Sequence, residues 1–173
     1  KQTRQLLSRA QSILDQVATA PSDLGDNGIS ALTVEERISF VVSQIRDVAG
    51  ITLHPNQVAC ALALVEDATI VELATGEGKT YAALAAAVAA SGDGPGVHVA
   101  TANAYLARRD AEIARELLGS SGITVGAIDE TMSSAAKQAA YQCSIVFGAA
   151  NEFGFDYLRD SSALRPSDLV QGV

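Results

Sequence analysis

The stretch VELATGEGKT, residues 71–80, decides how this chain folds. It places a glycine-rich turn between a short β-branched run at 69–73 and a strong helix-forming run at 80–91. A strand, a glycine turn and a helix in this order are the setting of a phosphate-binding loop. The stretch therefore predicts a phosphate site at the start of a helix.

The residue types of this loop suit a phosphate. Gly76 and Gly78 let backbone N–H groups turn inward without a Cβ in the way, and the next helix points its positive end at the same anion. Lys79 can reach the β- and γ-phosphates, and the Thr80 hydroxyl can hold Mg²⁺. The usual pattern has Gly or Ala where this chain has Leu73, so a glycine-rich turn with a solvated lysine is the alternative. We expect Lys79 to have no structural partner.

Strands alternate with helices after the loop, which predicts an α/β fold with a mostly parallel sheet. Strands are expected at 69–73, 97–101, 123–128 and 144–148, and helices at 80–91, 103–119, 133–142 and 150–160. Before the loop, helical spacing predicts a helix over 3–18, followed by a loop or flexible linker over 19–30. Two further helices are marked by a Thr33/Glu36 capping box, by Gly50 as a terminator, and by Pro55 as a first-turn residue.

Gln57 lies 22 residues before Lys79, at the start of a predicted helix. Its amide carries a donor and an acceptor, which match one edge of adenine. A glutamine at a helix start is usually only solvated. Its position relative to the loop is what makes it a candidate for adenine recognition.

Five motifs together resemble SecA, the bacterial preprotein translocase ATPase. They are HPNQ, VELATGEGKT, VHVATANAYLARRDAE, GITVGAID and NEFGFDYLRD, in the order and spacing of that family, over about 33–173. The last motif is the most specific, because phosphate loops are widespread. The resemblance implies a RecA-like P-loop motor domain, with residues 33–173 forming part of the first nucleotide-binding domain and residues 1–32 an N-terminal helical arm and linker.

The resemblance also implies a set of site residues. Gln57 would bind adenine, Lys79 would be catalytic, and Thr80 would hold Mg²⁺. Arg109 would lie near the nucleotide. The residues expected to bind ATP or ADP are Gln57, Thr75, Gly76, Glu77, Gly78, Lys79, Thr80 and Arg109.

Some positions depart from the family pattern. Ala74 stands where many members have arginine, Ala104 where the family usually has aspartate, and Ala149 and Ala150 where it has polar residues. These departures favour an accessory or divergent SecA paralogue. In the family, the acidic motif that positions Mg²⁺ and the attacking water follows the equivalent of Val173, so we interpret the chain as a truncated fragment that hydrolyses ATP negligibly by itself.

The composition bears on partners and location. Net charge is −8 and the pI about 4.6, which argues against a nucleic-acid binder. No apolar run is long enough to cross a membrane, and no signal-peptide core begins the chain. The resemblance implies a cytoplasmic protein that associates peripherally with the inner face of the cell membrane and acts on preproteins at the SecY channel, with a homodimer possible for the parent protein.

Two other functions remain open from the sequence. A superfamily 2 nucleic-acid helicase also uses a glutamine motif and this loop, although the acidic balance and NEFGFDYLRD count against it. A nucleotide-binding module without catalytic activity would carry the same residues. The tyrosines at 81, 105 and 141 and the aromatic residues Phe153, Phe155 and Tyr157 are expected in the core rather than as a stacking platform.

Overall fold

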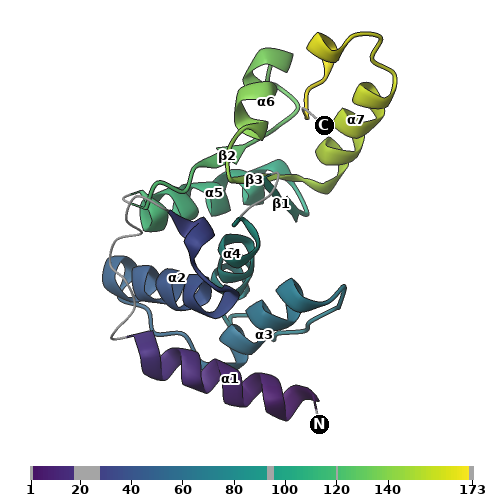
Figure 1. Cartoon of the computed structure of the whole chain (residues 1–173). Helices are drawn as coiled ribbons and strands as arrows, with labels where there is room; N and C mark the ends of the chain where they lie inside the picture. The colour runs from purple at the N-terminus through teal and green to yellow at the C-terminus, as the bar shows by residue number, and fades with distance from the viewer. Residues whose placement is uncertain (1, 18–27, 93–95, 120, 172–173) are drawn as a thin grey trace. The chain divides into compact units, whose positions relative to one another are not determined.

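The structure of the chain, a computed structural model, describes residues 2–17, 28–92, 96–119 and 121–171. The chain forms two compact units (Figure 1). The first unit comprises residues 1–94 and 116–122, and the second comprises residues 95–115 and 123–173. Most of the expected linker, over 18–27, lies outside the described residues.

The described part of the first unit is helical. Its elements are α1 (Gln2–Gln16), the 3₁₀ turn η2 (Ile29–Ala31), α2 (Val34–Ala49), α3 (Pro55–Glu66) and α4 (Lys79–Ala90). Helix α3 packs against both α1 and α4, and α2 packs against α4. The expected helix over 3–18 is thus confirmed as α1, and Arg9 on α1 forms ion pairs with Glu35 on α2 and Glu66 on α3.

Helices α2 and α3 begin and end where their capping residues predict. The Thr33 hydroxyl accepts from the Glu36 amide, and the Glu36 carboxylate accepts from the Thr33 amide at 2.8 Å. Gly50 ends α2 in the left-handed conformation, with φ of 68°. Pro55 occupies the first turn of α3, where its missing N–H costs no helical hydrogen bond.

Helix α4, which follows the glycine loop, is rich in alanine. Its sequence is KTYAALAAAVAA, and seven of its residues are buried. The buried residues are Ala82, Leu84, Ala85, Ala86, Ala87, Val88 and Ala89. Alanine is the strongest helix former and lets neighbouring helices approach closely, which fits α4 between α2 and α3.

The strand expected at 69–73 is not formed. These residues are described, but they have no strand assignment and Ile70 is 97% exposed. A strand requires a neighbouring strand for its backbone hydrogen bonds, and the β-branched run alone does not supply one. The prediction of a strand before the loop is therefore wrong for this structure, whereas the helix after the loop is confirmed.

The second unit contains a three-stranded parallel sheet. Its strands are β1 (Val97–Thr101), β2 (Val125–Ala127) and β3 (Ile145–Ala149), in the order β1-β3-β2. Val97 pairs with Ile145, and Val125 pairs with the same residue from the other side. All five residues of β3 are buried, as expected for the central strand of a parallel sheet.

The helices of this unit also follow the predicted alternation. They are α5 (Ala104–Leu118), most of which belongs to the second unit, α6 (Ser134–Tyr141) and α7 (Ala150–Ser161), followed by the 3₁₀ turn η3 (Pro166–Asp168). Helix α6 packs on β2, and α7 packs on β3 and β1. The chain therefore has the predicted α/β fold class, with a parallel sheet of RecA-like type preceded by an N-terminal helix.

Candidate functional site

The glycine loop directly precedes α4, and two of its glycines have a positive φ. Gly76 and Gly78 have φ of 88° and 68°, a left-handed backbone that favours glycine. Gly78 caps α4, and its carbonyl accepts from the amides of Tyr81 and Ala82 at 3.1 and 3.2 Å. The amides of the first turn of α4 therefore lie directly after the loop, where an anion is favoured.

Two charged side chains form hydrogen bonds with the backbone of Ala74. The Lys79 ammonium donates to the Ala74 carbonyl oxygen at 2.8 Å, and the Glu77 carboxylate accepts from the Ala74 amide at 2.9 Å. The expectation that Lys79 has no structural partner is therefore wrong. Both side chains are exposed, so each contact competes with water and with any anion that enters the loop.

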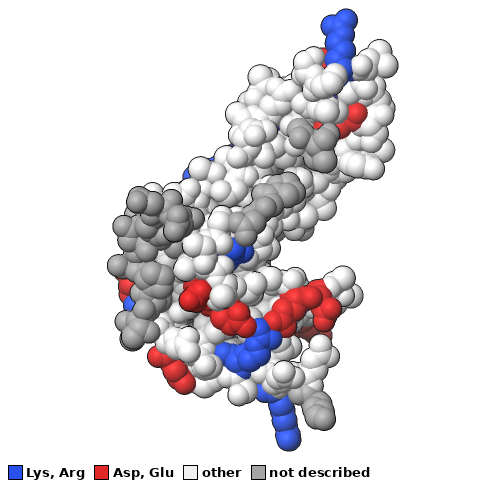
Figure 2. All heavy atoms as spheres, in the orientation of Figure 1, with Lys and Arg blue, Asp and Glu red and all other residues white. Residues whose placement is uncertain are grey.

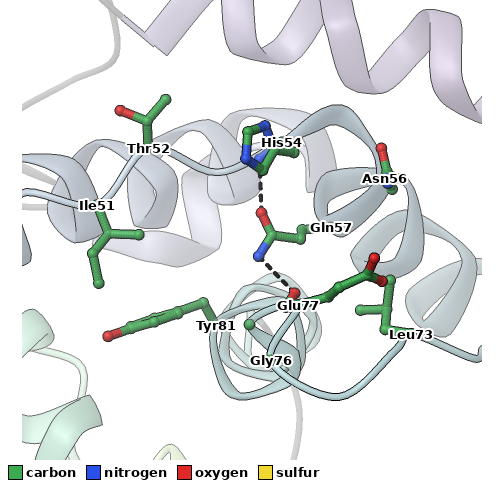
Figure 3. A pocket seen from close by; sticks show the side chains of 10 residues that line it. Ile51, Thr52, His54, Asn56, Gln57, Leu73, Gly76, Glu77 and Tyr81 are labelled. Carbon is green, nitrogen blue, oxygen red and sulfur yellow. Dashed lines mark hydrogen bonds between the residues drawn. The ribbon is translucent and has the colours of Figure 1, made fainter.

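Gln57 connects the start of α3 to the loop. Its side-chain oxygen accepts from the His54 amide at 2.7 Å, and its side-chain nitrogen donates to the Glu77 carbonyl at 2.9 Å (Figure 3). The residue is 8% exposed. A carboxamide has two N–H groups and two lone pairs, so one of each stays available after these two bonds.

A cavity of about 460 Å³ opens beside this contact. Figure 3 shows side chains from α3, from the segment before it and from the loop around this space. The lining residues are Ile51, Thr52, His54, Asn56, Gln57, Leu73, Gly76, Glu77, Gly78 and Tyr81. Its size falls within the range of small-molecule sites, and the loop forms part of its wall.

The other expected site residues occupy different surroundings. Thr80 is half-buried in the first turn of α4, and nothing in the described ranges gives its hydroxyl a hydrogen-bond partner. Thr75 is exposed in the loop. Arg109 lies on α5 within the second unit, where its guanidinium donates to Asp110 at 2.7 and 2.9 Å. The structure thus brings Gln57 to the loop but leaves the role of Arg109 a prediction.

The second unit contains a buried ionic cluster that no motif in the sequence predicted. The Lys137 ammonium on α6 donates to Glu152 at 2.8 Å and to Asp156 at 2.9 Å, both on α7. All three residues are almost fully buried, and the Tyr141 hydroxyl also donates to Asp156. Lys137 and Tyr141 are four residues apart, as are Glu152 and Asp156, a helical spacing that places each pair on one face.

The aromatic residues divide between core and surface. Tyr141 is buried, as expected, and its ring contacts Phe153. Tyr105, Phe155 and Tyr157 are exposed, so the expectation that they lie in the core is wrong. Tyr81 is only half-buried and borders the cavity.

The described surface carries charged side chains of both signs. Acidic and basic side chains are interspersed on the face shown in Figure 2, and the described residues there form no broad basic patch. Within the described ranges, no helix is both long and apolar enough to cross a membrane. The same residues contain no group of three His, Cys, Asp or Glu side chains placed to hold a metal ion.

Comparison with known proteins identifies relatives over almost the whole chain. The family of SecA DEAD-like domains matches residues 2–172. The protein translocase subunit SecA of Treponema denticola is 40% identical over 138 residues, which cover 80% of this chain and 15% of that protein. The subunits of the same name from Chromohalobacter salexigens and Afipia carboxidovorans are 44% identical over 127 residues and 39% identical over 145 residues. These cover 73% and 82% of this chain, which spans only 13 to 15% of the length of the three relatives.

Proposed function

Because this chain belongs to the family of SecA DEAD-like domains, we propose that it is the ATP-binding portion of a SecA-type motor. The parent motor couples ATP hydrolysis to the export of preproteins through the SecY channel. The observation that carries the proposal is the joining of Gln57 to the phosphate loop by the hydrogen bond to Glu77. Gln57 and the glycine loop line one cavity, which supports the binding of a base and of phosphates by these two features.

Each site residue has a role in this proposal. The backbone of 75–78 and the start of α4 hold the phosphates, and Lys79 leaves the Ala74 carbonyl to bind them. Thr80 offers its hydroxyl to Mg²⁺, and Gln57 uses its remaining N–H and lone pair on adenine. ATP supplies the phosphoanhydride bond whose hydrolysis drives the motor. Arg109 is proposed to lie near the nucleotide.

The residues present fit a nucleotide. A Cβ added at Gly76 would meet nothing within 4 Å, so the loop leaves open space at that point. At Gly78 a Cβ would lie 2.3 Å from the Gln57 side-chain nitrogen, so only glycine permits the contact between loop and amide. The Thr80 hydroxyl lacks a protein partner within the described residues, which leaves it available to a metal ion.

We also propose the wider context of the parent protein. Residues 1–32 form an N-terminal arm and linker, and residues 33–173 belong to the first nucleotide-binding domain. The parent is cytoplasmic and associates peripherally with the inner face of the membrane. The family departures at Ala74 and Ala104 favour an accessory or divergent paralogue.

The family match argues against one of the two alternative functions and does not separate the other from the motor. A nucleic-acid helicase is disfavoured, because the matched family and the three named relatives are SecA proteins and the net charge is −8. A nucleotide-binding module without catalytic activity has the same loop and the same Gln57 contact. Hydrolysis by the parent protein distinguishes this module from the motor.

Calorimetric titration of the 173-residue chain with ADP and Mg²⁺ tests nucleotide binding. We expect ADP to bind and to raise the free energy of unfolding by about 2.7 kcal/mol at a hundredfold excess over Kd, which thermal unfolding measures as a shift. GDP should bind more weakly, because its base edge reverses adenine's donor and acceptor. Lys79→Ala should weaken binding, whereas Arg4→Ala, which removes an exposed cation from α1 in the same unit, should not. Absence of a thermal shift at millimolar ADP, or an equal shift in Lys79→Ala, would contradict the assignment.

A further inference from the structure

Tyr81 borders the cavity beside the phosphate loop instead of joining the core. It lies in the first turn of α4, two residues after Lys79, and is only half-buried. In Figure 3 its ring extends from α4 away from Leu73 and Glu77. Its hydroxyl has no hydrogen bond within the part of the chain that the structure describes. By contrast, the core tyrosine, Tyr141, is 6% exposed and hydrogen-bonded to Asp156.

The ring and the Gln57 amide approach the same point on the loop. A Cβ built at Gly78 would lie 2.3 Å from the Gln57 side-chain nitrogen and 3.7 Å from Cδ2 of Tyr81. The amide and the edge of the ring therefore both face the space that a side chain at Gly78 would fill. Both also line the same cavity, where the loop meets the start of α4.

We propose that Tyr81 is the base-stacking wall of this cavity and supplies affinity for the base of the nucleotide. This rests on the proposed function, because the phosphates of the same ligand occupy the loop. A planar base has an apolar face and a polar edge. The Tyr81 ring offers an aromatic surface for the face, and Gln57 offers one N–H and one lone pair for the edge. Ile51 adds an apolar side chain to the same cavity.

The two residues contribute different parts of recognition. Stacking on an aromatic ring is tolerant of base identity, because every base has a π-face. Tyr81 therefore supplies affinity for a base in general. Gln57 is held by His54 and Glu77 and supplies the preference among bases.

Binding of ADP and of inorganic pyrophosphate to the 173-residue chain tests this division, since pyrophosphate has no base. Tyr81→Leu should weaken ADP binding by roughly tenfold or more, as expected for loss of base–aromatic stacking, and leave pyrophosphate binding unchanged. Tyr81→Phe keeps the ring and should bind both ligands as the natural chain does. Tyr105→Leu is the matched control, because Tyr105 is 72% exposed and lies in the second unit.

Intrinsic fluorescence gives a second readout. The chain has four tyrosines and no tryptophan, so a base stacked on Tyr81 should quench tyrosine emission and pyrophosphate should not. Loss of this ADP-dependent quench in Tyr81→Leu, at saturating ADP, supports the stack.

Three results would overturn the inference. Tyr81→Leu could bind ADP as tightly as the natural chain, or it could lose ADP and pyrophosphate equally, which would indicate damage to the loop. The natural chain could also bind pyrophosphate and ADP with equal affinity. This would show that the base adds nothing to binding, and would refute the base site while leaving the phosphate-loop assignment intact. Binding of neither ligand to the natural chain would refute the proposed function itself, and so is distinguishable from failure of the stack alone.

Discussion

The side-chain nitrogen of Gln57 donates a hydrogen bond of 2.9 Å to the carbonyl oxygen of Glu77, 20 residues further along the chain. Together with the bond from the His54 amide to the Gln57 side-chain oxygen, it connects the beginning of α3 to the glycine loop. Both ends of one amide therefore hold backbone groups that belong to different segments. The position of the loop depends on this side chain.

Gln57→Glu should lower the free energy of unfolding by about 1 to 3 kcal/mol. A carboxylate cannot donate to the Glu77 carbonyl, so two oxygen acceptors would face each other at a buried position. Urea unfolding of the two chains measures the difference. Asn56→Asp adds the same charge at the neighbouring exposed position in the first turn of α3, where an anion is tolerated. Equal stability of Gln57→Glu and Asn56→Asp would show that the amide bonds contribute nothing.

Two glycines of the loop should respond differently to alanine. Both have a left-handed backbone, which costs an L-residue about 1 to 2 kcal/mol. Only at Gly78 does the added Cβ also approach another group, at 2.3 Å from the Gln57 side chain, whereas at Gly76 it meets nothing within 4 Å. Gly78→Ala should therefore unfold at clearly lower urea than Gly76→Ala. The opposite order would mean that the Gln57 contact is not formed in solution.

The 173-residue chain should hydrolyse ATP far more slowly than the roughly 1 s⁻¹ at the lower end of competent phosphoryl-transfer sites. Within the described residues, the carboxylate of Glu77 is engaged by the Ala74 amide and that of Glu152 by Lys137. Glu77 is thus held toward the backbone of the loop and Glu152 is neutralised in the interior, so neither is arranged as a dedicated base for an attacking water. Steady-state phosphate release from the purified chain measures the rate. Turnover near 1 s⁻¹ that disappears in Lys79→Ala would prove the expectation wrong.

Removal of the buried cation should strongly destabilise the second unit. Lys137→Met leaves the carboxylates of Glu152 and Asp156 buried without their ammonium partner, a change that typically costs about 3 to 5 kcal/mol. Adding Glu152→Gln and Asp156→Asn to this variant should restore part of the loss. Arg159→Met is the matched control, because Arg159 also contacts Asp156 but its side chain is 53% exposed, so its ion pair should contribute no more than about 1 kcal/mol. Thermal or urea unfolding compares the four chains.

The same cluster predicts a loss of stability at alkaline pH. Burial acts to lower the pKa of Lys137, but its hydrogen bonds to Glu152 and Asp156 outweigh burial and hold the pKa above the ordinary lysine value. Burial raises the pKa of Tyr141 in the folded protein. Both groups retain their protons more strongly when folded, so their contribution is complete below the unfolded values and should fall as pH rises above about 10.

Unfolding free energies measured from about pH 8 to about pH 11 test this sign. Tyr141→Phe removes one of the two titrating groups and should make the decline shallower. Stability that rises over this range, or an unchanged slope in Tyr141→Phe, would contradict the prediction.

Local signals in the sequence predicted most of the helices and the three strands of the sheet. Thr33, Gly50 and Pro55 act through atoms within a few residues of themselves, so their effects are readable without knowing the fold. The run at 69–73 has equally good strand residues, yet it forms no strand, because pairing depends on a segment distant in sequence. Ile70, exposed at 97%, shows that the pattern alone does not provide the partner.

The site was predictable to a similar depth. The glycines and Lys79 marked the loop as a candidate phosphate site, because the chemistry of a phosphate favours those residues at that spacing. The partners of Gln57 and Lys79 were not predictable, since both bond to backbone atoms that any sequence would offer. The meeting of Lys137 with Glu152 and Asp156 required knowledge that α6 and α7 lie together, although the spacing within each pair was visible.

The alanines of α4 limit how this helix, which begins directly after the glycine loop, can respond to a displacement. An alanine side chain has no rotamers, so a closely packed row of them has no internal adjustment with which to absorb a displacement. A displacement of the first turn of α4 therefore has little side-chain freedom to absorb it at these alanines. Because α4 packs against both α2 and α3, a ligand that moved its first turn would act on both neighbouring helices.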